Sequence, residues 1–283
     1  MRRVLVMIAA IFGLSGPTWA AEETADPAAV DPPVCSACEA ALELALANPR
    51  RAEDRQRDAY RHPAQTLAFF RIRPGMTVVD YAPSGGWYTR ILVPYLGTDG
   101  RYIGLNPDVR QGDEQQKRYF AGLGETFPAK AAEWTGVSAS TIGAYNSDDL
   151  PAALYGTVDR VVVFRMMHNL LRMGMLDREL DVIHRLLKDD GLLGIEQHRS
   201  RADAPAAYVD GSKGYLRQAD VVRLVEAHGF TLVGTSEINA NPADSADHPE
   251  GVWELPPTLR TKREELKAVG ESDRMTLLFR KRT

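Results

Sequence analysis

Small residues follow a buried apolar run near residue 80, and this arrangement is suited to binding a ligand. Residues 78–81 read Val-Val-Asp-Tyr, and Ala-Pro-Ser-Gly-Gly then leads to Trp87. Small side chains let the backbone come close to a ligand, and free amide groups at the start of the following helix carry partial positive charge. An ordinary strand-to-helix turn has the same composition, so these residues alone leave both interpretations open.

Polar residues that could act on a substrate follow two later apolar runs. Arg165 and His168 come after Phe164, and His198 follows the run over 192–197. An unperturbed imidazole has a pKa of about 6.5, which suits a general base, and Arg165 suits an anionic acceptor or a cofactor carboxylate. His168 could equally cap the next helix or pack in the core. Other side chains that could line the same cleft are Glu196, Trp87, Tyr88, Arg61 and His62.

Methionines near His168 raise the alternative of a copper site. Met166, Met167, Met173 and Met175 carry the soft sulfur ligands that copper prefers. Methionines at helical spacing are more often core residues, so we predict no metal site here.

The two cysteines, Cys35 and Cys38, are expected to form a structural disulfide, because neighbouring cysteines usually pair in an oxidising compartment. A thioredoxin-type redox site would need a strand before this motif. Covalent haem attachment would need a histidine directly after the second cysteine, where the chain has Glu39.

The elements that must position these residues alternate between strand and helix from residue 76 to 238. Short apolar runs predict buried parallel strands, and longer stretches with apolar residues at helical spacing predict helices. Strands are expected at 76–81, 101–105, 140–144, 158–164, 192–197, 230–238 and 274–280. Helices are expected at 87–96, 111–123, 170–187 (ended by Gly191) and 218–228. This alternation predicts an α/β fold with a Rossmann-like, doubly wound, seven-stranded sheet.

Both ends of the chain depart from this alternation. Residues 239–272 are polar and rich in proline, so the last strand is expected to pair antiparallel with the preceding one, in an otherwise parallel sheet. Short helices are expected at 37–47, at 48–61 and after His62-Pro63. They predict an N-terminal helical cap over 37–73, before the main domain over 74–283.

Residues 1–20 are typical of a secretory signal peptide. Two arginines precede an apolar run over 4–14, and a Gly-Pro pair and small residues lead up to Ala20. Eleven apolar residues are too few for a spanning helix, which needs ~20. We expect cleavage after Ala20, a flexible lead-in over 21–36 and a periplasmic product without stable membrane insertion. The arginine pair also leaves the twin-arginine route open.

Charge and composition argue against a nucleic-acid partner. The chain of 283 residues has a formal net charge of −4 and no basic run interleaved with aromatic residues. It therefore lacks the positive charge that drives nucleic-acid binding, and no nucleic-acid partner is expected.

The segment after residue 78 resembles motif I of the class I S-adenosylmethionine-dependent methyltransferases, in which an acidic residue precedes Gly-x-Gly-x-Gly. Asp80 takes the acidic position, and Ala82, Ser84 and Gly86 take the three glycine positions. The wider text is similar to a narrower group of exported bacterial predicted methyltransferases, over about residues 50–283. The stretches that carry this similarity are 57–63, 83–92, 164–169, 198–199, 241–244 and 279–281.

The resemblance implies S-adenosylmethionine as the cofactor and assigns residues to it. Asn106, with Asp108 as a substitute, matches the position that holds the ribose, and the segment from Asn146 matches the one that touches the adenine. The implied cofactor-binding residues are Asp80, Ala82, Pro83, Ser84, Gly85, Gly86, Trp87, Asn106, Asn146, Ser147 and Phe164. The catalytic candidates are His168, Arg165 and His198. A turn and helix cap is the alternative interpretation of Asn146.

Two functions from different classes remain in competition. The first is methyl transfer to a small molecule or an envelope component. The second is a non-catalytic protein of the same fold that binds another ligand in the same cleft, because function follows the site and not the fold.

Overall fold

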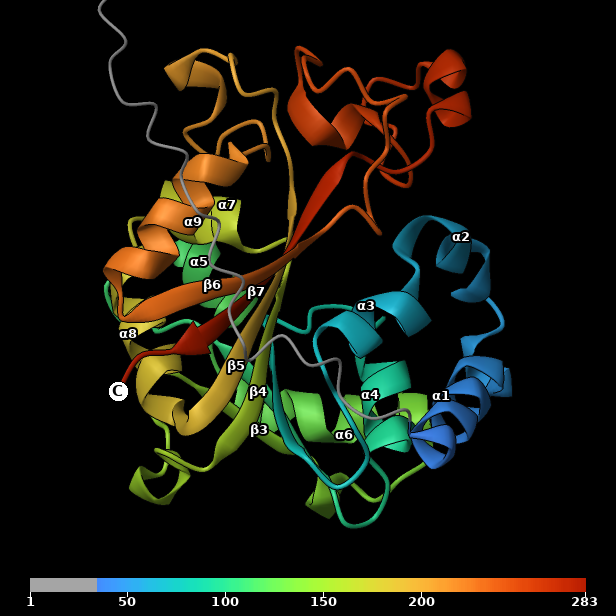
Figure 1. Cartoon of the computed structure of the whole chain (residues 1–283), viewed down its shortest axis with the longest axis vertical. Coiled ribbons are helices and arrows are strands. Elements are labelled where there is room, and N and C mark those ends of the chain that lie inside the picture. Colours follow the sequence, from blue (N-terminus) through green and yellow to red (C-terminus); the bar gives the residue numbers. More distant parts are fainter. Residues whose placement is uncertain (1–34) are drawn as a thin grey trace, which may run out of the picture. The chain divides into compact units, whose positions relative to one another are not determined.

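A seven-stranded sheet in the order β3-β2-β1-β4-β5-β7-β6 organises residues 35–283, the part of the chain that the computed structural model describes (Figure 1). Neighbours from β3 to β5 pair in parallel, and β7 pairs antiparallel with both β5 and β6. The strands are β1 Thr77–Tyr81, β2 Arg101–Asn106, β3 Gly143–Asn146, β4 Val158–Phe164, β5 Leu187–His198, β6 Phe230–Ser236 and β7 Arg274–Lys281. The predicted mostly parallel sheet with an antiparallel last strand is confirmed.

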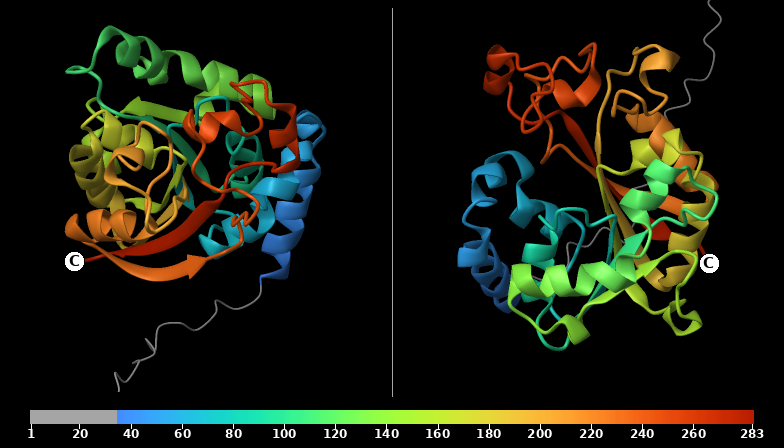
Figure 2. Two further views of the ribbon diagram at one scale, coloured as in Figure 1. Left: turned by 90° about the horizontal axis from the view of Figure 1, so that it is seen from above. Right: turned by 180° about the vertical axis from the view of Figure 1, so that it is seen from behind.

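Helices cover both faces of this sheet (Figures 1 and 2). They are α1 Ser36–Ala47, α2 Asp58–Arg61, α3 Pro63–Phe69, α4 Thr89–Leu96, α5 Glu114–Phe120, α6 Leu123–Thr135, α7 Met167–Arg172, α8 Leu176–Leu186 and α9 Gln218–Ala227. The helices α1, α3, α4 and α6 contribute to one buried apolar cluster, and α7, α8 and α9 contribute to another. None of the helices within residues 35–283 is both long and apolar enough to cross a membrane.

Successive side chains on each strand point into opposite clusters, as the pleat of a strand requires. On β1, Val78 belongs to the cluster under α4, whereas Val79 and Tyr81 belong to the cluster under α8. Burial on both faces explains why the central strands are apolar almost throughout. The polar exception on β1 is Asp80, which shares the face of Val78 and is 2% exposed.

The disulfide predicted between Cys35 and Cys38 is confirmed and lies at the start of α1. The predicted signal peptide over 1–20 and nearly all of the predicted lead-in over 21–36 lie outside the described residues. Residues 35–283 form one compact unit, in which α1 packs on α4.

Several predicted helix boundaries are wrong, and glycine explains two of them. The helix predicted over 170–187 is interrupted at Gly174, whose φ of +66° ends α7 before α8 begins. Gly191 does not cap a helix, because β5 already begins at Leu187 and passes through Gly191 with a register shift against β4. The helix predicted over 111–123 ends at Phe120, and Gly122, with a φ of +66°, separates it from α6.

The helix predicted over 48–61 is replaced by short turns. Asn48 accepts a hydrogen bond from the Arg50 amide, as expected for a cap, but the helical turn after it ends at Arg51. The Arg51 guanidinium donates back to the Leu46 carbonyl and also to Asp58. These bonds hold the segment folded back on α1, and regular helix resumes only in α2.

Candidate functional site

A hollow of about 330 Å³ lies at the carboxyl ends of β1 and β4. The order of the strands reverses between β1 and β4, and ligands of open α/β sheets bind at that point. Eight predicted site residues line the hollow: Asp80, Ala82, Pro83, Ser84, Gly85, Trp87, Phe164 and Arg165. The structure therefore brings the turn after β1 and the end of β4 together in one cavity.

The turn after β1 has an unusual backbone. Ala82, Ser84 and Gly86 have φ values of +55°, +47° and +74°, in the region that favours glycine. These are the three positions that the resemblance aligns with glycines, so all three adopt a conformation that glycine favours although two of them are not glycine. Non-glycine residues in this conformation cost about 1–3 kcal/mol each and are concentrated at functional sites.

The two glycines of this turn have different surroundings. A Cβ atom on Gly86 would lie 2.3 Å from the Trp134 ring, so Gly86 is needed for the close approach of α6. A Cβ atom on Gly85 would meet nothing within 4 Å. The backbone at Gly85 therefore faces open space, where a ligand can approach it.

A second hollow of about 220 Å³ lies on the β2 side of the turn, and Ser84 lines both hollows. Asn106 also lines the second hollow, as does Lys130 from α6. Ligand pockets typically measure about 300–1,000 Å³. The larger hollow lies at the lower end of this range, and a ligand that extends into both hollows would pass over Ser84.

The side chains predicted to contact adenosine form hydrogen bonds within the protein instead. Asn106 donates to the Phe120 carbonyl over 2.9 Å. Asn146 accepts from the Leu123 amide over 3.1 Å and donates to the Phe120 carbonyl over 2.9 Å. The hydroxyl of Ser147 donates to the buried Glu179 over 3.0 Å.

Asn146 and Ser147 therefore line neither hollow. For Asn146 this geometry favours the helix-cap alternative, because its side chain accepts the amide at the start of α6. Asp108 is held by Arg110 and Arg178 and is likewise engaged.

Aromatic rings form one wall of the larger hollow. The Tyr88 and Phe164 rings are stacked with centroids 3.5 Å apart, and Trp87 meets Tyr88 edge-on at 4.7 Å. The Arg61 guanidinium lies 4.6 Å from the centroid of the Trp87 ring. Such an arrangement fixes the arginine in place through its attraction to the π system.

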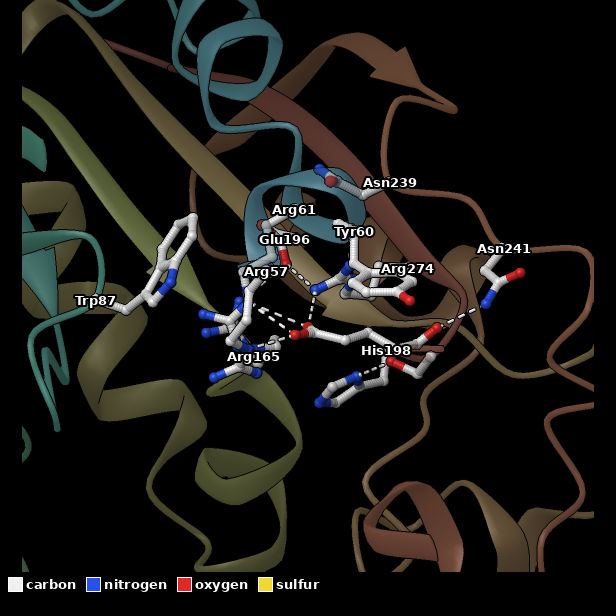
Figure 3. A network of polar contacts seen from close by, with 12 residues as sticks. Arg57, Tyr60, Arg61, Trp87, Arg165, Glu196, His198, Asn239, Asn241 and Arg274 are labelled. Carbon is white, nitrogen blue, oxygen red and sulfur yellow. Dashed lines mark hydrogen bonds and ion pairs between the residues drawn. The ribbon is translucent and has the colours of Figure 1, made fainter. Parts of the chain in front are cut away.

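Four arginines and two glutamates form a buried network beside this wall (Figure 3). Glu271 receives hydrogen bonds from Arg57 over 2.6 Å, from Arg61 over 3.1 Å and from Arg274 over 3.0 Å. Glu196 lies on β5 and accepts from Arg165 over 3.0 Å. The network connects α2, the end of β4 and the segment before β7.

Two further contacts complete this network. Arg274 lies 3.1 Å from Glu196, and the Tyr88 hydroxyl donates to Glu196 over 3.1 Å. Glu196 therefore joins the aromatic wall to the arginines.

Burial and charge shift the pKa values of three groups here. Burial, with Arg165 as a second cause, lowers the pKa of Arg61 to about 9. Burial raises the pKa of Glu271, but Arg61, Arg274 and Arg57 outweigh it, and the pKa falls to about 2. Burial raises the pKa of Asp80 to about 7, despite hydrogen bonds from Tyr102 and Thr89.

The two histidines predicted to be catalytic do not line the larger hollow. The Nδ1 atom of His168 lies 3.3 Å from Gln197 Oε1, and burial lowers the pKa of His168 to about 4. The Nδ1 atom of His198 lies 2.6 Å from the Ser272 hydroxyl, and burial also lowers the pKa of His198. These positions favour the core alternative for His168. The methionines beside it, Met166, Met167 and Met175, are buried in the core.

Residues 35–283 contain no group of three or more His, Cys, Asp or Glu residues arranged to hold a metal ion.

Several residues of the hollow and its network were not predicted. Asp54 and Arg90 line the hollow as a bidentate pair, and Glu271 and Arg274 hold the arginines from behind. No local motif marks Asp54, Glu271 or Arg274. Arg57 and Arg90 appeared only within stretches that carry the resemblance.

Known structures share this fold. The cyclase SpnF is 19% identical with a TM-score of 0.52, and the alignment covers 84% of this chain and 86% of SpnF. A protein from Galdieria sulphuraria, assigned as a sarcosine dimethylglycine methyltransferase, is 12% identical with a TM-score of 0.51. That alignment covers 83% of this chain and 91% of the other. One of these proteins is a cyclase, so the likeness shows the fold alone.

The chain has no match among known protein-family profiles. No curated protein sequence matches it either.

Proposed function

We propose that this chain is an S-adenosylmethionine-dependent methyltransferase that acts on a small molecule. The observation that carries the proposal is the turn at 82–86, where three alternating residues adopt positive φ beside two hollows at the switch point of the sheet. The sheet order and the likeness to solved methyltransferase-fold structures support it.

The residues present fit such a cofactor at the turn. Gly85 and Ser84 present backbone beside open space, and Trp87 and Phe164 supply apolar walls. S-adenosylmethionine supplies a methyl group on a positively charged sulfur, and its transfer is governed mainly by orientation. The stacked Tyr88 and Phe164 rings and the network behind them are suited to holding an acceptor rigidly in the larger hollow.

Asp80 is the residue of this hollow whose shifted pKa lies nearest to neutral pH. Burial raises the pKa of its carboxyl to about 7, and a general base works best when its pKa lies near the operating pH. The predicted base His168 has a pKa of about 4 and lies outside the hollow, so it is a weaker candidate.

We also propose the cellular compartment in which this protein acts. The composition of residues 1–20 supports export, and the disulfide of Cys35 and Cys38 is consistent with an oxidising surrounding. We therefore place the chain in the periplasm, among exported methyltransferases, as part of the proposal.

Titration calorimetry tests cofactor binding directly. We expect S-adenosylmethionine and S-adenosylhomocysteine to bind purified protein with a Kd below about 1 mM and to raise its Tm by mass action. Gly85→Leu places a bulky side chain at the open position, whereas Gly85→Ala adds one methyl group. We expect Leu to weaken binding at least about tenfold and Ala to leave it nearly unchanged.

Absence of both heat and thermal shift at millimolar ligand would reject the proposal. The second candidate, a non-catalytic protein that binds another ligand in the same cleft, would then be favoured. The engaged side chains of Asn106 and Asn146 support that candidate, because the Nδ2 atom of Asn106 and both polar atoms of Asn146 bind the protein itself and not a ligand. Mass spectrometry of ligand that co-purifies with the protein would test it.

A further inference from the structure

We propose that Arg57, Arg61 and Arg165 form an oxyanion-binding subsite in the larger hollow, which takes the carboxylate or phosphate group of an anionic acceptor. This inference names the acceptor class and so rests on the proposed function, although the subsite itself does not depend on a cofactor. All three arginines line the hollow.

Each of these arginines uses only part of its guanidinium group within the protein (Figure 3). Arg57 and Arg61 donate through Nε to Glu271, and Arg165 donates through Nη1 to Glu196. Among residues 35–283, no acceptor meets the Nη1 and Nη2 atoms of Arg57 and Arg61, or the Nε and Nη2 atoms of Arg165. Because guanidinium groups match carboxylate and phosphate with paired donors, these free nitrogens are suited to an oxyanion.

The charges of the network do not balance. The four arginines exceed the two glutamates by two positive charges, and Arg274 lies behind the others with its Nε atom buried and unpaired. Arg61 is 4% exposed, so water screens its charge poorly. Burial and the nearby Arg165 lower the pKa of Arg61 to about 9, which measures how unfavourable its charge is there. A bound anion would offset that cost.

The other charged groups that face the hollow leave this excess in place. Arg90 and Asp54 neutralise each other through bonds of 2.5 and 2.8 Å. Asp80 carries a partial negative charge near neutral pH, because burial raises its pKa to about 7. At most one of the two surplus charges is therefore cancelled by the protein.

A third hollow, larger than the two described above, does not have this surplus of positive charge. It measures about 840 Å³ and lies against α9. Its arginines are paired: Arg199 with Glu237 and Asp273, and Arg217 with Asp220. The four arginines of that hollow meet four carboxylates, so its charges balance, although the Nε atom of Arg217 is also unpaired. The surplus of positive charge therefore distinguishes the hollow at β1 and β4 from this one.

The surplus charge favours the acceptor over the cofactor as the source of the anion. The amino-acid end of S-adenosylmethionine carries one ammonium and one carboxylate group, and its sulfur adds a further positive charge. Binding of that cofactor would leave the hollow more positive than before. A negatively charged acceptor would offset the surplus positive charge. It would be attracted by the arginines and by the positively charged sulfur of the cofactor.

Phosphate titration tests the subsite without any cofactor. We expect inorganic phosphate to bind wild-type protein, and the heat to persist when chloride matches the ionic strength. Arg57→Gln should weaken phosphate binding at least about tenfold, because it removes two free donors. Arg57→Lys keeps the charge beside Glu271 and should weaken binding less, which separates charge from fork geometry.

Arg201→Gln is the matched control. Arg201 lies in the other hollow, is paired with Asp203 and is exposed. We expect its phosphate affinity to stay within about twofold of the wild type, because an exposed pair contributes little. Circular dichroism of each variant verifies that it is folded.

Titrations with S-adenosylhomocysteine and 5′-methylthioadenosine on the same variants distinguish the sources of the anion. If Arg57→Gln loses phosphate but binds S-adenosylhomocysteine within about twofold of wild type, the acceptor assignment is supported. If it loses S-adenosylhomocysteine but keeps 5′-methylthioadenosine, which lacks the carboxylate, the arginines hold the cofactor and the acceptor assignment is overturned. Wild-type protein that does not bind phosphate overturns the subsite itself. Phosphate binding without any binding of S-adenosylhomocysteine supports the subsite and rejects the methyltransferase.

Discussion

Glu271→Gln should destabilise the protein strongly, because Glu271 is the anion that three buried arginines share. It is 6% exposed and accepts hydrogen bonds from Arg57, Arg61 and Arg274. Its pKa falls from 4.5 to about 2 on folding. At about 1.36 kcal/mol per pKa unit, this difference corresponds to about 3 kcal/mol, similar to the cost of breaking a buried ion pair.

Urea unfolding measures this loss. With an m-value of about 3 kcal/mol/M, the midpoint should fall by about 1 M at pH 7. The pKa of Glu271 is lower in the folded state, so its contribution is present above pH 4.5 and is lost as the pH falls through 2. The curves of wild type and variant should therefore converge between pH 4.5 and pH 2.

Glu265→Gln is the matched control for this experiment. Glu265 lies on the surface, pairs with Arg263 and has a side chain that is 65% exposed. We expect no measurable change in the urea midpoint, because solvent screens this pair. A Glu271→Gln variant as stable as the control, or a loss that does not vary with pH, would refute the assignment of Glu271 as the shared counter-ion.

Three further substitutions test the end of β1 and the turn after it. The pKa of Asp80 is raised to about 7 in the folded state, so the wild type should lose up to about 4 kcal/mol of stability between pH 4 and pH 7. Urea unfolding of Asp80→Asn should not show that loss. Unfolding free energies of wild type and variant that change with pH in parallel would contradict the shift. Gly86→Ala should cost about 2 kcal/mol, because it combines a positive φ with a clash against Trp134. Gly85→Ala should change the unfolding free energy by no more than about 0.5 kcal/mol, and equal effects at the two glycines would show that the turn is not packed as described.

The sheet could be predicted from the sequence because its signal is local. Strand β4 is buried on both faces, and its second half, over 161–164, reads as a continuous apolar run. The turn after β1 was found from its small residues for the same reason. Its positive φ values at Ala82 and Ser84 were not predicted, because these residues rarely adopt that conformation.

Helix α6 was missed although its sequence carries a signal. Leu123, Phe127 and Ala131 recur every four residues and are buried. Gly124 and Pro128 lower the intrinsic helix propensity of the segment. Tertiary packing against β2 and β3 overrides that propensity, so the apolar spacing was the better guide.

The arginine network could not be predicted, because its members meet only in the folded chain. Arg57 and Glu271 are separated by 214 positions, and Glu271 lies in a polar segment without a motif. The histidines show the opposite error. Their residue type suggested catalysis, but the fold buries His168 beside Gln197 and His198 beside Ser272.

The position of β7 between β5 and β6 has a consequence for biosynthesis. Strand β6 pairs with β7, and β7 joins it to the rest of the sheet. A nascent chain therefore cannot close its sheet before Arg274–Lys281 has left the ribosome, at about 5–20 residues per second. Until then β6 has no partner in the sheet, so the polypeptide stays incompletely folded until its synthesis has reached β7.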